Sequence, residues 1–245
     1  EHYTARQIIN HIEGIGGEIN AYTTKEETTF YAATLNNHFR TTLHLLGDMV
    51  LRPTFNRKET DKEVTVILDE IESYNDSPSE LIYDDFENMI FEGNSLAMPI
   101  LGTKKTLKRI SKSPDYPLNG MKQHYRPELM VLFVQGNVTT KQVIAAAEKE
   151  LAHLASIPNS YSVSSPSSLS ATKERVYRRH THQTHVMLGS HSFPIGHPKQ
   201  LTMFLLNNIL GGGSMSSRLY LSLREKYGLV YNIDSQAVPL SDTGY

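Results

Sequence analysis

Apolar residues recur every three or four positions between residues 57 and 74. The stripe consists of Val64, Ile67, Leu68 and Ile71, and this spacing places its members on one face of a helix. The pattern therefore predicts one long amphipathic helix over 57–74.

Two acidic residues accompany that stripe. Glu63 and Glu70 are seven residues apart, which is two helical turns, or about 10 Å along the same face. Ile67 shares this face, so both carboxylates are expected next to the apolar side. A carboxylate in an apolar setting costs free energy unless it is paired or binds a cation. The pattern alone leaves two interpretations open: a solvated acidic surface with Lys62 as a partner, or a cation site.

The rest of the chain mixes helical and strand patterns. Thr4 and Gln7 have the spacing of a capping box, and Gly16-Gly17 ends the apolar stripe that follows them. Further helices are expected at 4–15, 39–51, 80–91, 114–125, 139–155, 199–210 and 214–225. Strands are expected at 18–23 and 28–34, joined by a turn at 24–27, and at 130–135, 175–179, 185–189 and 230–237.

The order of these elements predicts an α+β fold, in which antiparallel sheets are packed with helices. Residues 156–172 are rich in Ser and Pro and have almost no apolar pattern, which is typical of a linker. We therefore expect a first domain at 1–157, a linker at 158–173 and the start of a second domain at 174–245. A long-period duplication with an incomplete second copy fits the repeated order of elements.

Composition narrows the function classes. The net charge is −2 and a fifth of the residues are charged, so no strong attraction to nucleic acid or to an anionic membrane is expected. No basic cluster is interleaved with aromatic residues, which also argues against nucleic acid. Cysteine is absent, which excludes disulfides, a catalytic thiol and thiolate-bound zinc. No apolar run is long enough to span a membrane.

Two other stretches contain residues that could bind a metal ion or a phosphate, but their patterns are weak. His180, His182 and His185 lie close together, yet a strand would place His185 on the opposite face from the other two. Gly211 to Ser217 precedes a helix but lacks the Gly-Lys-Ser/Thr ending of a phosphate-binding loop. We interpret the histidines as an incidental cluster and the glycines as a turn and helix cap.

Four stretches together resemble the pitrilysin/insulinase family of zinc metallopeptidases, in particular its processing-peptidase-like branch. They are Gly16–Thr23, Glu63–Glu70, Gly211–Leu219, and Leu223–Lys226 together with Gly228–Tyr231. The order and spacing of these stretches are more specific than any one of them. The resemblance implies a duplicated, LuxS-like metalloprotease fold and a metalloendopeptidase that hydrolyses peptide bonds with a zinc-bound water as nucleophile.

The resemblance also implies roles for individual residues. Members of the family carry an H-x-x-E-H motif on a helix, which supplies two histidine ligands and a general base. Counting onward from its usual place matches Glu70 to the third zinc ligand. Glu63 matches a glutamate that helps to position the site.

The implied substrate is a peptide or an unfolded protein. The segment Asn20, Ala21 and Tyr22 matches the family's strand edge, to which the substrate adds as a strand. Arg224 and Tyr231 match a pair that grips the substrate and stabilises the oxyanion.

The sequence departs from the family at the zinc motif, because it contains no H-x-x-E-H. Catalytic zinc needs three protein ligands, so the zinc site is incomplete in this chain and the chain by itself is expected to be inactive. Because Glu1 stands in place of Met and Thr4 already caps a helix, we expect the chain to begin inside a longer protein. The alternative function is a catalytically inactive homologue that acts as a partner or scaffold subunit.

Assembly and location follow only from the resemblance. Dimers are common in this branch, so a homodimer or a heterodimer is expected. The sequence shows no recognisable signal peptide, and the bacterial cytoplasm or periplasm is the expected compartment.

Overall fold

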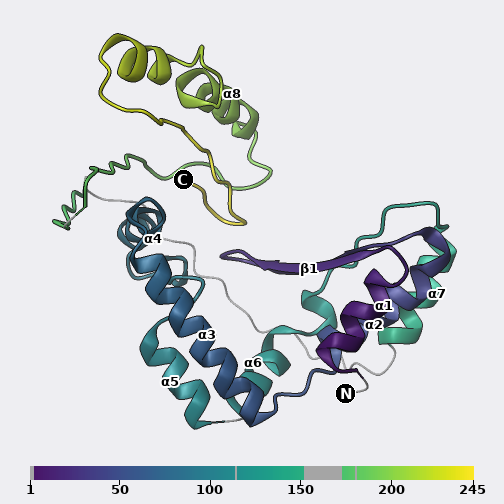
Figure 1. Ribbon diagram of the computed structural model, residues 1–245. Coiled ribbons are helices and arrows are strands. Elements are labelled where there is room, and N and C mark those ends of the chain that lie inside the picture. Colours follow the sequence, from purple (N-terminus) through teal and green to yellow (C-terminus); the bar gives the residue numbers. More distant parts are fainter. Residues whose placement is uncertain (1–2, 114, 152–172, 180) are drawn as a thin grey trace. The chain divides into compact units, whose positions relative to one another are not determined.

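The computed structural model describes residues 3–113, 115–151, 173–179 and 181–245 (Figure 1). These residues fall into two compact units, one made of the described residues within 1–73 and 100–162 and the other of those within 74–99 and 163–245. Residues 158–172 of the predicted linker lie outside the described residues, as do residues 152–155 of the predicted helix at 139–155. Helices dominate the described residues, with one two-stranded antiparallel sheet.

The hairpin of the first unit is formed as the sequence predicts. Strand β1 (Glu18–Thr23) pairs antiparallel with β2 (Thr28–Ala33). Helix α1 (Ala5–Glu13) begins with both hydrogen bonds of the Thr4–Gln7 capping box. Helices α1, α2 (Phe39–Leu51) and α7 (Thr140–Leu151) gather at one end of the hairpin (Figure 1).

Two adjacent glycines connect α1 to β1, and each is needed for a different reason. Gly16 has a φ of +72°, which is a left-handed conformation that favours glycine. Gly17 lies so close to its neighbours that a Cβ atom would be 2.6 Å from Thr34 Cγ2 and 3.0 Å from Ile12 Cγ2. The close approach lets the buried Ile12 pack beneath the hairpin.

Polar contacts join α2 to α7. Glu150 accepts from His44 Nδ1 at 3.0 Å and lies 3.5 Å from Arg52 Nη2. Arg52 also donates to Asp48 at 2.7 Å, and the two carboxylates raise the pKa of its guanidinium. These contacts hold α7 against α2, the helix that carries the buried side chains Leu43 and Leu45.

Helix α3 (Arg57–Asn75) matches the long helix predicted from the apolar stripe. It is connected to α5 (Lys104–Lys112) at two points: Lys104 Nζ lies 2.6 Å from Glu72 Oε1, and Arg57 donates to the Ser111 carbonyl at 3.1 Å. Helix α6 (Asp115–His124) follows. Sequence reasoning missed α5, because only Leu107 and Ile110 mark its apolar side.

The second unit has its own apolar core. Helix α4 (Pro78–Ile90) contributes Phe86 and Ile90, which cluster with Phe91, Leu96 and Leu240. Tyr245 packs against this cluster and donates a 2.5 Å hydrogen bond to Glu87. Burial, together with this hydrogen bond, raises the pKa of the Tyr245 phenol.

The remaining elements are short or lie apart from the core. Helix α8 (Gln200–Gly211) matches its prediction. The helix predicted at 214–225 is mostly a π-helix, η4 (Tyr220–Lys226), which follows a turn at 215–216 and two α-helical residues at 218–219. Three 3₁₀ turns are η1 (Asn36–His38), η2 (Ser95–Ala97) and η3 (Pro127–Leu129).

The strands predicted at 130–135, 175–179, 185–189 and 230–237 are wrong for the described residues, none of which forms a ladder there. A strand needs a paired neighbour, and β-branched composition alone does not supply one. Ser235 shows what replaces the ladder: its N–H donates to the Gly211 carbonyl at 2.8 Å and its carbonyl accepts from Asn207 at 2.8 Å. The segment is therefore attached to the end of α8.

Candidate functional site

One edge of β1 is open among the described residues, because β2 is its only neighbour. Thr24 N–H donates to the Glu27 carbonyl at 2.8 Å at the start of the hairpin. Hydrogen-bonded and non-hydrogen-bonded pairs alternate along an antiparallel ladder, so Ala21, opposite Phe30, falls in a non-hydrogen-bonded pair. Its N–H and carbonyl point away from β2, towards the open edge.

A side chain of the same strand covers this outward N–H. Asn20 Oδ1 accepts from Ala21 N–H at 2.8 Å, which agrees with the outward direction inferred from the register. The amide acceptor satisfies a backbone donor that would otherwise be left to solvent. A ligand strand that binds the edge must therefore replace this local hydrogen bond.

Tyr22 lies on the exposed face of the hairpin. Its side chain is 51 % exposed, and its ring centroid is 6.2 Å from that of Tyr31 on β2. Residues two apart share a face of a strand, so Asn20 is on this same side and Ala21 on the other. Asn20, Ala21 and Tyr22 thus lie on a strand with one open edge among the described residues.

The two glutamates of α3 are exposed. The predicted apolar stripe is present, with Val64 buried and Ile67, Leu68 and Ile71 partly buried, but Glu63 and Glu70 face solvent. Among the described residues neither carboxylate makes a hydrogen bond or an ion pair.

Lys62 is not a partner for either glutamate, because its Nζ lies 3.0 Å from Glu59. Because Glu63 and Glu70 are exposed, their carboxylates do not incur the free-energy cost of an apolar setting. Both carboxylates are accessible to a ligand brought to the surface of α3.

The residues that the structure describes do not by themselves fit a catalytic zinc ion. Such an ion takes three protein ligands and one open position, whereas Glu70 offers one oxygen donor group. No group of three or more His, Asp or Glu side chains that could hold a metal ion occurs among the described residues. We therefore derive no chemical step through zinc from this chain alone.

Arg224 and Tyr231 are seven residues apart in the sequence, and their side chains are in contact. The Arg224 Cζ atom lies 4.9 Å from the centroid of the Tyr231 ring and 4.7 Å from that of Tyr220. Arg224 Nη1 also donates to the Tyr220 hydroxyl, and its Nε lies 4.0 Å from Glu225. The guanidinium is therefore within cation–π distance of both aromatic rings.

Tyr220 is a residue that sequence reasoning missed. It lies four positions before Arg224 on η4, and side chains at that spacing are neighbours on a helix, so the i, i+4 pattern could have found it. π-helices are rare and frequently occur at functional sites. Tyr231 is 78 % exposed, so the Arg224–Tyr231 pair presents an accessible cationic and aromatic surface.

The described residues of the two competing stretches show no comparable arrangement. His182 and His185 are exposed, and His180 lies outside the described residues. Gly211 accepts from Ser235 at the end of α8, and Gly212 N–H bonds back to the Asn207 carbonyl at 3.1 Å. The glycine run therefore forms a helix C-terminus, in agreement with its interpretation as a turn and cap.

Comparison with known proteins decides the family. A family model described as "Insulinase (Peptidase family M16)" matches residues 1–104, and one described as "Peptidase M16 inactive domain" matches residues 119–245. The chain belongs to the M16 peptidase family. The pitrilysin/insulinase resemblance of the sequence is thereby confirmed.

Relatives of this M16 chain are named as zinc proteases. It is 34 % identical over 241 residues to "Uncharacterized zinc protease YmxG" of Bacillus subtilis, covering 98 % of this chain and 58 % of that protein. It is also 34 % identical over 245 residues to an "Uncharacterized zinc protease" of Rickettsia bellii, covering 98 % of this chain and 57 % of the relative. The M16 chain thus spans little more than half the length of these relatives.

Solved structures support the fold. The crystal structure of a peptidase M16 inactive domain from Pseudomonas fluorescens matches with a TM-score of 0.79 at 20 % identity, over 99 % of this chain and 59 % of that one. The crystal structure of a protease from Helicobacter pylori matches with a TM-score of 0.78 at 19 % identity, over 100 % of this chain and 60 % of that one. Within the described part of the M16 chain, no helix has the length and apolar character to cross a membrane.

Proposed function

We propose that this M16 chain supplies the peptide-binding part of a zinc-dependent metalloendopeptidase. The observation that carries the proposal is the open edge of β1, where the Ala21 N–H and carbonyl face away from β2. An extended peptide adds to such an edge through main-chain hydrogen bonds, and pockets for alternate side chains give specificity. The exposed Tyr22 ring offers an apolar surface to a side chain of the bound peptide.

Arg224 and Tyr231 are proposed as the second substrate contact. A guanidinium has five N–H donors, and Arg224 uses one for the Tyr220 hydroxyl. The remaining donors are suited to a peptide carbonyl or to the oxyanion that forms from it. The two rings beside Arg224 restrict the guanidinium, so less conformational freedom is lost when it binds.

Glu70 is proposed as one zinc ligand, and Glu63 as a residue that positions it. They lie seven residues apart on one face of α3, and both carboxylates are accessible to a ligand. Because the described residues do not contain a full ligand set, hydrolysis is proposed for the gene product that contains this chain. We also propose that residues 1–157 and 174–245 are related LuxS-like copies, joined by the linker at 158–173.

A second candidate function is a scaffold or partner subunit without activity. It is favoured by the family description of residues 119–245 as an inactive domain. A scaffold gives no reason for Glu63, Glu70, Arg224 and Tyr231 to occur together, so we place the peptidase first.

Peptide binding to the β1 edge is tested with a proline at the outward N–H. Ala21→Pro removes the outward donor without removing a bond of the β1–β2 ladder, and proline is tolerated at such edge positions. We expect the affinity for a short fluorescein-labelled peptide of uncharged Thr, Val and Ser residues, measured by anisotropy, to fall about tenfold.

Ala32→Pro is the matched control, because Ala32 lies opposite Ile19 in the ladder and its N–H faces the other edge of the hairpin. This variant is expected to leave the affinity within about twofold of the parent. Equal losses in both variants would overturn the assignment of the peptide to β1.

The metal role is tested by zinc content in the gene product that contains this chain. Glu70→Gln removes a charged ligand and is expected to abolish zinc retention after dialysis, whereas Glu63→Gln is expected to weaken activity more than metal content. Glu72→Gln is the matched control on the same helix, since Glu72 pairs with Lys104. Full zinc occupancy in Glu70→Gln defeats the ligand assignment, and a parent protein without zinc supports the scaffold.

A further inference from the structure

Helix α5 has one strongly basic face. Five of its nine residues are cations: Lys104, Lys105, Lys108, Arg109 and Lys112. At 100° per residue these positions fall within an arc of about 140°. The buried Leu107, 4 % exposed, anchors the opposite side. The charges are therefore collected on one outward surface.

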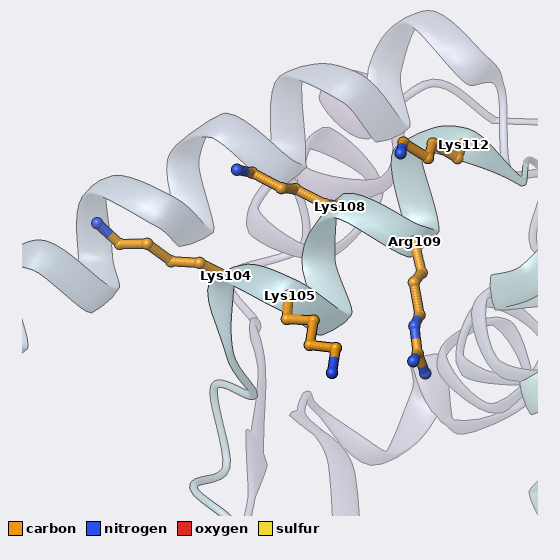
Figure 2. A pocket seen from close by; sticks show the side chains of 5 residues that line it. All are labelled: Lys104, Lys105, Lys108, Arg109 and Lys112. Atoms are coloured by element: carbon orange, nitrogen blue, oxygen red, sulfur yellow. The ribbon is translucent and has the colours of Figure 1, made fainter.

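These side chains border a shallow hollow of about 410 Å³, and all of its lining residues are cationic. Figure 2 shows Lys104 and Lys108 extending to one side of α5, and Lys105 and Arg109 to the other. Lys104 is paired with Glu72. In the part of the chain that the structure describes, the other four cations have no side-chain hydrogen bond or ion pair. Most of the positive charge is thus available to a ligand.

The arrangement is unfavourable for the helix itself. Lys104 and Lys105 occupy the first turn, which contains no acidic residue, although the helix dipole favours anions there. Lys108 lies four residues from both Lys104 and Lys112, and like charges at that spacing repel. Sequences break local rules mainly where a function requires it. The basic face is better explained by a ligand than by the stability of α5.

The spacing of the cations identifies the shape of that ligand. Lys108 and Lys112 are about 6 Å apart along the helix axis, as are Lys105 and Arg109. Alternate side chains of an extended peptide are about 6.6 Å apart and point to the same side. A peptide that runs along α5 can therefore place each second side chain next to a cation.

We infer that the basic face of α5 binds an acidic segment of the peptide substrate, with Asp or Glu at alternating positions. This inference rests on the proposed function, because it names the substrate class of the same peptidase. Carboxylates are the matching groups for Lys and Arg. Substrates with such a segment are bound more tightly than neutral ones.

Two other polyanions fit the surface less well. Nucleic acid is commonly held by aromatic stacking as well as charge, and α5 has no aromatic residue, while the whole chain has a net charge of −2. An anionic membrane is bound by helices that also insert an apolar face, but Leu107 is buried in this unit. A short acidic peptide needs only the local charge.

The test measures the affinity of this chain for labelled peptides by fluorescence anisotropy. The probe is a short fluorescein-labelled peptide with glutamates alternating with serines, and its reference carries glutamines instead. We expect the glutamate peptide to bind about tenfold more tightly, and Lys105→Gln/Lys108→Gln to remove most of that difference. Lys141→Gln/Lys149→Gln is the matched control, since it removes two exposed cations of α7 and is expected to change the affinity less than twofold.

Each outcome of this experiment supports or overturns an acidic-peptide site on α5. Equal losses in both double variants would show a general charge effect and overturn the inference, as would equal affinity for the two peptides. Tighter binding of a single-stranded oligonucleotide or of phosphatidylserine vesicles, lost in the α5 variant, would overturn it in favour of those ligands. Ala21→Pro separates the two proposals: loss of neutral-peptide binding reports on β1, and loss of the glutamate preference reports on α5.

Discussion

Replacing Gly17 by alanine is expected to destabilise the first unit by sterics alone. The new Cβ would lie 2.6 Å from Thr34 Cγ2, 2.8 Å from the Ala33 carbonyl oxygen and 3.0 Å from Ile12 Cγ2. One of these atoms is backbone and another belongs to the fully buried Ile12, so neither can move away cheaply. Overpacking of this kind costs about 1–3 kcal/mol, which corresponds to a fall in melting temperature of about 3–10 °C.

Calorimetry gives the melting temperature, and hydrogen exchange over residues 5–33 shows whether the loss begins at the α1–β1 junction. The matched control is Gly120→Ala. Gly120 lies inside α6, and no neighbouring atom comes within 4 Å of the place that an alanine methyl group would take, so alanine is expected to stabilise by about 0.5–1 kcal/mol. An unchanged or raised melting temperature in Gly17→Ala would refute the close packing of α1 under the hairpin.

Two further predictions concern the second unit. Tyr245→Phe removes the hydrogen bond to Glu87 and is expected to cost about 1–3 kcal/mol at neutral pH in urea unfolding. Because the folded-state pKa of Tyr245 is raised above its ordinary value of 10.0, its contribution is full below pH 10 and is lost progressively as the pH rises from there through the folded-state pKa, so the variant should show a flatter alkaline decline. Arg224→Lys replaces the planar guanidinium beside Tyr231 and is expected to raise the rate of amide hydrogen exchange across η4 several-fold. Lys226→Arg, on the same helix, is expected to leave this rate unchanged. Equal exchange rates in both variants would contradict the contribution of the Arg224–Tyr231 contact.

Local rules predicted the helices and the hairpin well. The capping box at Thr4 and the two glycines after α1 determine the start and end of that helix through contacts a few residues apart, and the structure contains each of them. The apolar stripe of α3 likewise depends on spacing alone. Such features are readable because their partners are near in sequence.

Features that depend on distant partners were not predictable in the same way. The segment at 230–237 has strand composition, but Ser235 is held by Asn207 and Gly211 at the end of α8. Helix α5 lacks an apolar stripe and was missed, although its cations recur at helical spacing. Spacing placed Glu63 and Glu70 beside the apolar stripe and left open a solvated surface or a cation site; both side chains face solvent, which depends on what packs against α3 and not on the helix itself.

The hydrogen bond from Ala21 N–H to the Asn20 side chain has a consequence for the behaviour of the protein in solution. An unpaired strand edge is a template on which a second copy can stack, and this is a common origin of aggregation. By occupying the outward donor, the Asn20 amide acts as a removable cover that discourages self-pairing at low ligand concentration. Colloidal stability of the hairpin and its capacity to accept a peptide therefore depend on the same side chain.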